Sequence, residues 1–226
     1  MQRASIMIAL LALASTPMLA QDPVKVAAKQ CKVAFENDYV RVLSWSVSPH
    51  EKTAMHGHPS MVSISLSASK TRFTSPDGKT REVDSKAGQA TWSDPDKHSS
   101  EALGDKAGGL LIQVELKKRP GAGMTALAPA EDSVAVDPKH YKLEFQNDRV
   151  RILRIKYGPG EKSVMHAHPA NVAVILTGGQ AKMTLPDGKA NALDLKTGQV
   201  LWADKEKHLP ENSGSKSFEL ILVELK

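Results

Sequence analysis

The chain has few of the residues that build disulfide scaffolds, helix bundles or fibrous proteins. Of its 226 residues, one is cysteine and 4% are aromatic. The single cysteine, Cys31, allows no internal disulfide, so the fold must be held by its core alone. Few aromatic residues beside 15 glycines and 13 prolines suit short strands and turns better than long helices, and a collagen or a coiled coil is excluded.

No charge of one sign dominates either. The 30 basic residues are interleaved with 25 acidic ones, which leaves a formal net charge of +5. No single basic face is implied, so nucleic acid is not expected as a partner. The hydrophobic content of 41% is enough for a packed core and excludes disorder of the whole chain.

Long apolar runs are missing except at the N-terminus. Arg3 precedes an apolar run at residues 6–13 and a small or turn-forming stretch at 14–20, which is the order of a secretory signal. We predict a signal peptide at residues 1–20, a periplasmic or secreted location, and no stable membrane insertion after cleavage. The alternative, a membrane anchor, is disfavoured because the run is well below the ~20 residues that span a bilayer.

The chain repeats itself after 110 residues. The sequence Phe-Glu-Asn-Asp-Tyr-Val-Arg-Val-Leu at 35–43 returns as Phe-Gln-Asn-Asp-Arg-Val-Arg-Ile-Leu at 145–153, and Met-His-Gly-His-Pro at 55–59 returns as Met-His-Ala-His-Pro at 165–169. Roughly two in five positions are identical across the ungapped stretch, which is far beyond chance for unrelated segments. The chain is therefore a tandem duplication of one domain.

The duplication sets the domain organisation. We place an N-terminal domain at residues 24–116 and a C-terminal domain at 134–226. Residues 117–133 between them are rich in proline, glycine and alanine with no apolar period, which is typical of a linker.

Within one copy the pattern is one of short strands. Residues 150–157, 172–177 and 218–225 are rich in β-branched and aliphatic side chains. Residues 182–185 and 190–195 flank the turn sequence Pro-Asp-Gly-Lys, which predicts a hairpin. About eight such strands per copy predict an all-β chain of two tandem jelly-roll β-barrels.

Three histidines in each copy have the spacing of metal ligands. His166 and His168 alternate along a predicted strand, so both imidazoles project to the same side, and His208 follows on another predicted strand. In the first copy the same places hold His56, His58 and His98. Three imidazoles leave coordination positions open on a first-row divalent metal ion, whereas the alternative is that all six are ordinary polar residues on sheet surfaces.

The sequence around these histidines resembles a known family. Gly-Glu-Lys-Ser-Val-Met-His-Ala-His at 160–168 and His-Leu-Pro-Glu-Asn at 208–212 are similar to the two sequence motifs of the cupin superfamily, and the duplication resembles a bicupin. The resemblance covers nearly all of the chain after residue 20. It implies jelly-roll barrels whose motif histidines bind Fe, Mn, Zn, Ni or Cu inside the barrel.

One departure from the family pattern bears on the metal site. Many metal cupins carry a glutamate four or five residues after the second histidine, and these places hold Val172 and Ala173 in the second copy and Val62 and Ser63 in the first. Strand alternation further predicts that Asn171 points away from the histidines. We therefore predict a three-histidine site, which resembles the iron sites of thiol dioxygenases and disfavours oxalate degradation.

Three further residues are candidates for the surroundings of the site. Alternation places Asn212 on the same side as His208, as a hydrogen-bond donor behind the ligands or a weak ligand, with a polar strand-end residue as the alternative. The first copy has Ala102 there, so the second site is expected to be better preserved. Trp92 and Trp202 either wall the ligand pocket or belong to the core.

Two classes of function fit these observations. The first is an exported metal-dependent enzyme, of dioxygenase type in one version, that acts on a small organic molecule at the open coordination positions. The second is a non-catalytic module that binds a small molecule or the metal itself. A third reading is a structural cupin that has lost metal in one or both copies. A monomer or a homodimer is expected.

Overall fold

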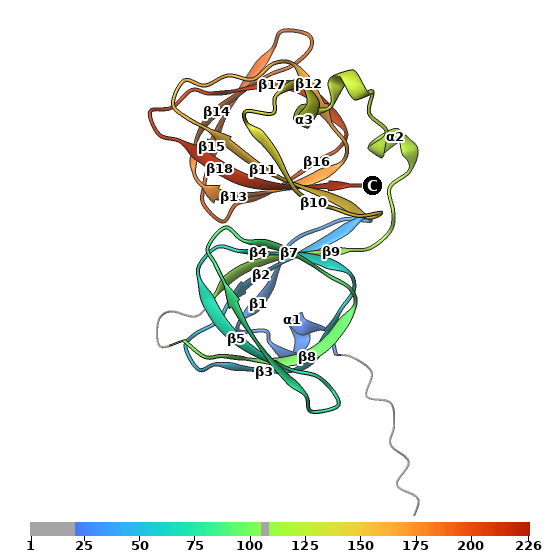
Figure 1. Cartoon of the computed structure of the whole chain (residues 1–226), viewed down its shortest axis with the longest axis vertical. Coiled ribbons are helices and arrows are strands. Elements are labelled where there is room, and N and C mark those ends of the chain that lie inside the picture. Colours follow the sequence, from blue (N-terminus) through green and yellow to red (C-terminus); the bar gives the residue numbers. More distant parts are fainter. Residues whose placement is uncertain (1–20, 105–108) are drawn as a thin grey trace, which may run out of the picture.

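The computed structural model describes residues 21–104 and 109–226, and these consist mainly of strands (Figure 1). The signal-peptide prediction for residues 1–20 lies outside the described residues. Two barrels follow one another along the chain, the first below the second in Figure 1. Among the described residues, no helix is long and apolar enough to cross a membrane.

The first barrel consists of two antiparallel sheets. One has the strand order β1-β2-β9-β4-β7 and the other has the order β3-β8-β5-β6. The strands are β1 (Cys31–Glu36), β2 (Val40–Ser46), β3 (Lys52–His58), β4 (Met61–Ser65), β5 (Ser69–Thr74), β6 (Thr80–Ser85), β7 (Ala90–Ser93), β8 (Asp96–Ala102) and β9 (Leu110–Leu116).

The second barrel repeats this topology. Its sheets have the orders β10-β11-β18-β13-β16 and β12-β17-β14-β15. The strands are β10 (Tyr141–Gln146), β11 (Val150–Tyr157), β12 (His166–His168), β13 (Asn171–Thr177), β14 (Gly179–Thr184), β15 (Ala190–Leu195), β16 (Val200–Ala203), β17 (Glu206–Asn212) and β18 (Phe218–Leu225).

This arrangement confirms the prediction of an all-β chain with two tandem jelly-roll barrels. Within residues 21–104 and 109–226, each barrel has nine strands rather than about eight. The hairpin predicted around Pro-Asp-Gly-Lys joins β14 to β15, and its glycine, Gly188, has a φ of 82°. That left-handed conformation is the one for which glycine is preferred in a turn.

Short helices lie outside the barrels. Helix α1 (Pro23–Val26) precedes the first barrel, and α2 (Ala122–Thr125), the 3-10 helix η1 (Pro129–Glu131) and α3 (Ser133–Val136) lie between the barrels in sequence. The segment predicted as a linker contacts the second barrel, because the backbone amide of Ala170 donates to the carbonyl of Met124 and Lys207 pairs with Glu131.

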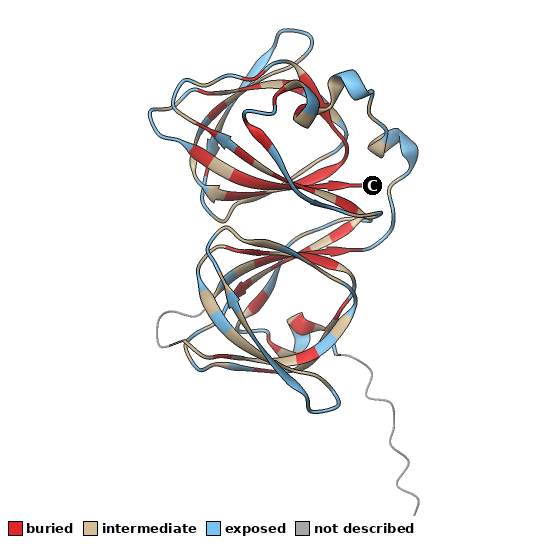
Figure 2. Cartoon of the chain, viewed as in Figure 1, coloured by how far each residue is buried: buried red, intermediate tan, exposed pale blue. Residues whose placement is uncertain are grey.

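The two barrels share one hydrophobic core. Their five-stranded sheets face each other, and buried aliphatic residues from both form a single cluster, seen as the red strands at the centre of Figure 2. Val62, Val114, Val172 and Val223 are each 0% exposed. Burying this much apolar surface stabilises the pair, so neither barrel is expected to be an independent unit.

Stacking between aromatic side chains of the two barrels extends this interface. Trp202 of the second barrel stacks on Phe35 and Tyr39 of the first, with ring centroids 6.1 and 6.0 Å apart. Trp92 of the first stacks on Phe145 of the second at 6.3 Å. Offset stacking of this kind adds about 0.5–1.5 kcal/mol per pair beyond the area buried.

Gly178 lies at the tight passage from β13 to β14. A Cβ atom at this position would lie 2.5 Å from the backbone carbonyl oxygen of Leu195, so the backbone would have to move. We expect Gly178→Ala to lower the free energy of unfolding by about 1–3 kcal/mol, as measured by chemical denaturation. Gly123→Ala is the control, because nothing lies within 4 Å of its added Cβ. Equal stability of the two variants would contradict the role given to Gly178.

Candidate metal centres

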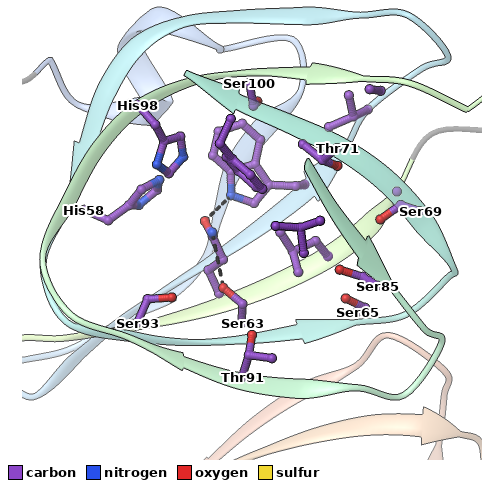
Figure 3. A pocket seen from close by; sticks show the side chains of 18 of the residues that line it. His58, Ser63, Ser65, Ser69, Thr71, Ser85, Thr91, Ser93, His98 and Ser100 are labelled. Carbon is purple, nitrogen blue, oxygen red and sulfur yellow. Dashed lines mark hydrogen bonds between the residues drawn. The ribbon is translucent and has the colours of Figure 1, made fainter. Parts of the chain in front are cut away.

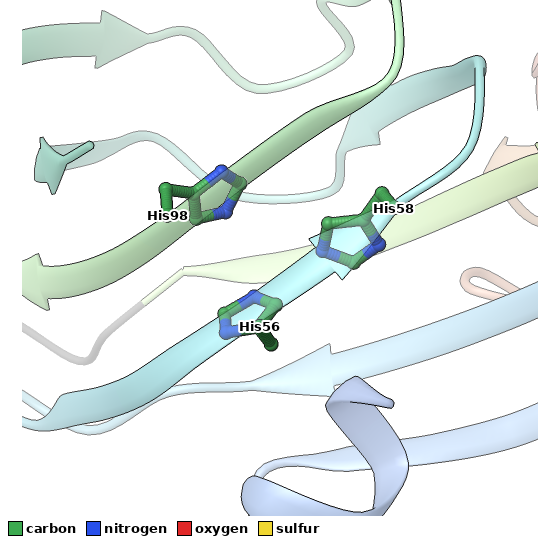
Figure 4. A group of neighbouring side chains, drawn as sticks. All are labelled: His56, His58 and His98. Carbon is green, nitrogen blue, oxygen red and sulfur yellow. The ribbon is translucent and has the colours of Figure 1, made fainter. Parts of the chain in front are cut away.

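The structure brings the six predicted histidines together as two trios. His56 and His58 lie on β3 and His98 lies on the neighbouring strand β8 (Figure 4). His56 is paired in register with His98, as His166 on β12 is with His208 on β17. The two strands of each trio are therefore hydrogen-bonded neighbours in one sheet rather than strands that face each other across the barrel.

Each trio has the geometry of a metal site. Within a trio, one ring nitrogen from each histidine lies within 4.8 Å of the others. The Nε2 atoms of His166 and His168 are 3.1 Å apart. Two nitrogens that are each about 2.1 Å from one ion lie about 3.0–3.4 Å from each other, so this spacing matches shared coordination. All six side chains are buried.

Acceptors around the Nδ1 atoms fix which nitrogen can bind a metal. Nδ1 of His56 lies 2.7 Å from the carbonyl oxygen of Ala54, and Nδ1 of His166 lies 2.7 Å from that of Val164. A carbonyl oxygen only accepts, so each Nδ1 carries the proton and donates it. Nε2 is then left unprotonated and free to coordinate, which is the arrangement found behind most ligating histidines.

Carboxylates play the same part for the third histidine of each trio. Nδ1 of His98 lies 3.0 Å from a carboxylate oxygen of Asp96, and Nδ1 of His208 lies 3.3 Å from one of Glu206. Both acids are two residues before the histidine on the same strand, so alternation places them on the same face.

Burial keeps the imidazoles of His166 and His98 neutral. It lowers the pKa of His166 to about 3, and repulsion from His168 and His208 acts in the same direction. It also lowers the pKa of His98 to about 4, although the hydrogen bond to Asp96 opposes this. Neutral imidazole is the form that binds a metal ion, so a proton need not be displaced from these two rings at neutral pH.

A buried glutamate lies behind the second histidine of each trio. In the second barrel, Glu224 on β18 accepts from His168 Nδ1 at 2.7 Å and from Arg151 Nε at 2.5 Å. The guanidinium of Arg151 also pairs with Asp132, 2.5 Å away, and Asp132 caps helix α3. Glu224 is 1% exposed, so its charge is compensated by these partners rather than by water.

The first barrel contains the same chain of contacts. Glu115 accepts from His58 Nδ1 at 2.7 Å and from Arg41 Nε at 2.6 Å, and Arg41 pairs with Asp22 at 2.6 Å. Burial favours the neutral carboxyl of Glu115, but the hydrogen bonds from His58 and Arg41 outweigh it and lower its pKa. An ionised carboxylate behind His58 orients the ring and raises the basicity of its Nε2.

The donor set fits a divalent metal ion. Nε2 of His58 is a buried nitrogen with no hydrogen-bond partner among the described residues. Leaving such an atom unpaired costs about 1–3 kcal/mol, and coordination to a metal would satisfy it. Three imidazole nitrogens suit first-row ions such as Fe, Mn, Zn, Ni or Cu, and leave further coordination positions open.

Each trio lies at the wall of a cavity between the two sheets of its barrel. The first cavity has a volume of about 160 Å³ and is lined by all three histidines of its trio, together with many serine and threonine side chains (Figure 3). The second has a volume of about 250 Å³ and is lined by His168, His208 and mainly aliphatic side chains.

The prediction that Asn171 points away from the histidines is wrong. Asn171 and Ala173 line the second cavity, whereas Val172 points into the core between the barrels. The chain passes from one sheet to the other between β12 and β13, so parity does not carry across residues 169 and 170. Ala173 therefore lines the cavity beside the histidines, and its methyl side chain cannot coordinate a metal ion.

Asn212 is buried, but its hydrogen bonds go to the backbone. Its Nδ2 donates to the carbonyls of Tyr157 and Lys216, and its Oδ1 accepts from the amide of Gly214. It supports the end of β17 rather than the histidines. Both trios are complete, so the expected better preservation of the second is not seen in the ligand geometry.

The two tryptophans differ in their relation to the cavities. Trp202 lines the second cavity while it stacks on the first barrel. Trp92 does not line either cavity in the described part of the chain, and its indole donates to Asp94 at 3.1 Å. Both indoles lie mainly at the interface between the barrels.

Sequence reasoning missed two aromatic residues that pack on the ligands. Trp45 lies against His56, with centroids 5.6 Å apart, and donates to Gln113 at 2.6 Å. Tyr141 packs edge-on against His166 at 4.7 Å. Both lie in strands that mix apolar, polar and charged residues, and spacing along the chain does not show which aromatic residue meets a histidine.

Comparison with solved structures gives the same fold. A variant of oxalate decarboxylase from Bacillus subtilis is 11% identical with a TM-score of 0.59, over 83% of this chain and 69% of that chain. A cupin 2 conserved barrel domain protein from Leptotrichia buccalis is 13% identical with a TM-score of 0.52, over 87% and 88%. A further B. subtilis oxalate decarboxylase structure, described for its Mn(II) centres, is 14% identical with a TM-score of 0.54, over 83% and 69%.

At these identities the likeness concerns the fold. It agrees with the tandem arrangement of two jelly-roll barrels. No protein-family model matches the chain, and no curated protein matches its sequence.

Proposed function

We propose that the chain is an exported, metal-binding bicupin, with one divalent ion in each barrel, that acts as a metal-dependent enzyme on a small organic molecule. His56, His58 and His98 would hold one ion, and His166, His168 and His208 the other. The observation that carries the proposal is that every one of these histidines has its Nδ1 beside an acceptor, so six Nε2 atoms converge in two groups of three.

A bound divalent ion would supply Lewis acidity and open coordination positions for an oxygen-bearing ligand. The protein contributes the rest. Glu115 and Glu224 fix the orientation of the second histidine in each trio. Manganese is one candidate, because it is the metal named for the B. subtilis oxalate decarboxylase of similar fold. The missing glutamate ligand separates this chain from oxalate chemistry.

A non-catalytic binding module is the second candidate. Among the described residues that line the two cavities, the only carboxylates are Asp96 and Glu206, and both lie beside a histidine Nδ1. No free carboxylate is then available as a general acid or base. Turnover of small thiols, phenols or dicarboxylates by the metal-loaded protein would support the enzyme, whereas affinity without turnover would support the binding module.

Metal stoichiometry tests the metal sites themselves. We expect two equivalents of metal per wild-type chain by plasma mass spectrometry after reconstitution. The double variants His56→Ala/His98→Ala and His166→Ala/His208→Ala should each keep one, because each removes two of three ligands from one site. His50→Asn, outside both trios, is the control. Folded wild-type protein that takes up no metal would overturn the proposal.

A further inference from the structure

The two cavities have similar histidines but different walls. Eight serine and threonine side chains line the first cavity, and Figure 3 labels all of them together with His58 and His98. No serine or threonine lines the second cavity in the described part of the chain. We propose that the first barrel binds a small hydroxy acid beside its metal and that the second barrel does not. This deepens the proposed function and rests on it, because the ligand would meet the ion held by His56, His58 and His98.

The difference between the two cavity walls can be seen by comparing equivalent positions of the two copies. Thr71 and Ser93 are replaced, 110 residues later, by Ala181 and Ala203. Ser65 and Ser85 are replaced by Ile175 and Leu195. Each of these four hydroxyl-bearing residues therefore has an aliphatic equivalent in the second copy, and Ile175, Leu195 and Ala203 line the second cavity.

These hydroxyl groups are available to a ligand. Within the described residues, the side chains of Ser65, Thr71, Ser85 and Ser93 make no hydrogen bond. A hydroxyl both donates and accepts, so a set of them around a small cavity suits a ligand that itself carries hydroxyl groups. If an apolar ligand filled the cavity, these hydroxyl groups would be buried without hydrogen-bond partners, which is unfavourable.

Two further hydroxyl groups of the first cavity, those of Ser63 and Ser100, are already paired. The Oγ of Ser63 accepts from Gln113, and Ser100 shares a hydrogen bond with Thr53 at 2.8 Å. The hydrogen bond between Gln113 and Ser63 is one of the dashed lines in Figure 3. Most of the hydroxyl groups in the wall therefore remain available to a ligand.

A positively charged side chain in the wall of the first cavity favours a ligand that carries a carboxylate. Arg81 on β6 lines the first cavity, with its guanidinium 4.5 Å from the ring centre of Phe73 and 3.6 Å from Asp96. The equivalent residue of the second copy is Asn191. A guanidinium presents donors in a planar fork that matches a carboxylate, so Arg81 favours an anionic end on the ligand.

The volume limits the size of the ligand. A cavity of roughly 150 Å³ accommodates a ring of about six carbon atoms, and the first cavity has about 160 Å³. A three- or four-carbon hydroxy acid is of this size. The second cavity is larger, at about 250 Å³, but its aliphatic wall would leave ligand hydroxyls unpaired.

Isothermal titration of the metal-loaded full-length chain with three related probes tests the proposal. Glycerate carries hydroxyls and a carboxylate, glycerol carries hydroxyls only, and propionate carries a carboxylate only. We expect glycerate to bind at one site per chain and at least about tenfold more tightly than either of the others. Propionate binding as tightly as glycerate would overturn the role of the hydroxyls, and two equal glycerate sites would overturn the assignment to one barrel.

Variants locate the site. Removing three unpaired hydroxyls in Ser65→Ala/Thr71→Ala/Ser93→Ala should weaken glycerate binding at least about tenfold, and the control Ser46→Ala, at an exposed position, should not. Arg81→Gln should weaken glycerate binding several-fold and leave glycerol unchanged. Unchanged glycerate affinity in the triple variant would overturn the proposal.

Metal content separates the two proposals. If wild-type protein takes up no metal, the proposed function fails, and with it the ligand site beside the ion. If metal is bound in both barrels but glycerate binding is absent, or persists in His56→Ala/His98→Ala with one remaining ion, only the inference about the first cavity fails.

Discussion

Glu224→Gln is expected to weaken metal binding in the second barrel roughly 10–100-fold and to lower the free energy of unfolding by about 3–5 kcal/mol. The carboxylate of Glu224 joins His168 to Arg151, and it is 1% exposed. The neutral amide keeps an acceptor for His168 but leaves the charge of Arg151 with only Asp132 as partner. A partly uncompensated buried charge is among the most costly local changes in a protein.

Because the chain is duplicated, the same substitution can be compared at the equivalent glutamate of each barrel. Metal affinity is measured by chelator competition in His56→Ala/His98→Ala, where only the second site remains, and in His166→Ala/His208→Ala, where only the first remains. Glu224→Gln should affect the former and Glu115→Gln the latter, because each glutamate contacts one trio.

A surface pair provides the stability control. Glu144 pairs with Arg154 in a half-exposed position, so Glu144→Gln should change the free energy of unfolding by less than about 1 kcal/mol. If Glu224→Gln matched this control in both metal affinity and stability, the buried carboxylate would have no special role behind the ligand.

Local sequence pattern was sufficient for the fold. The structure confirms strands at the predicted residues 150–157, 190–195 and 218–225 as β11, β15 and β18. It also brings the three histidines of each copy close together. These features depend on period-two alternation and on a repeat that places the same residues at the same offset, and both can be read along one chain.

The residues behind the ligands depended on contacts between distant strands. Glu224 lies in an otherwise apolar strand and meets Arg151 and His168 only because β18 is central in its sheet. A signal was present, since a charged residue in a buried strand must have a partner and Glu115 recurs in the same place of the first copy. The sequence alone does not say which arginine and which histidine that partner is.

The difference between the walls of the two cavities could not be predicted from the sequence either. Threonine is common in strands whatever it faces, and neither Thr71 nor Ser93 differs from the polar residues around it. Only the folded barrel shows that these side chains surround one cavity together with His58 and His98. Alternation also failed at Asn171, where the chain changes sheets.

Val174→Asp should prevent both barrels from folding, not only the second. Val174 is 0% exposed and belongs to the core that the two five-stranded sheets share. An unpaired carboxylate there costs several kcal/mol, which is comparable to the total stability of about 5–15 kcal/mol of a typical domain. Val33→Asp is the matched control, because Val33 on β1 is 43% exposed, and it should fold with both metal sites intact.

Val174→Ala provides the graded form of the same test if the aspartate variant yields no soluble protein. Loss of two methyl groups from the shared core should lower stability by about 1–3 kcal/mol. Denaturation followed separately by metal release from each site, in the single-site backgrounds, should show both transitions shifted together. The reason is that Val174 packs in one cluster with Val62 and Val114 of the first barrel. A shift confined to the second barrel would show that the barrels fold as separate units despite their common core.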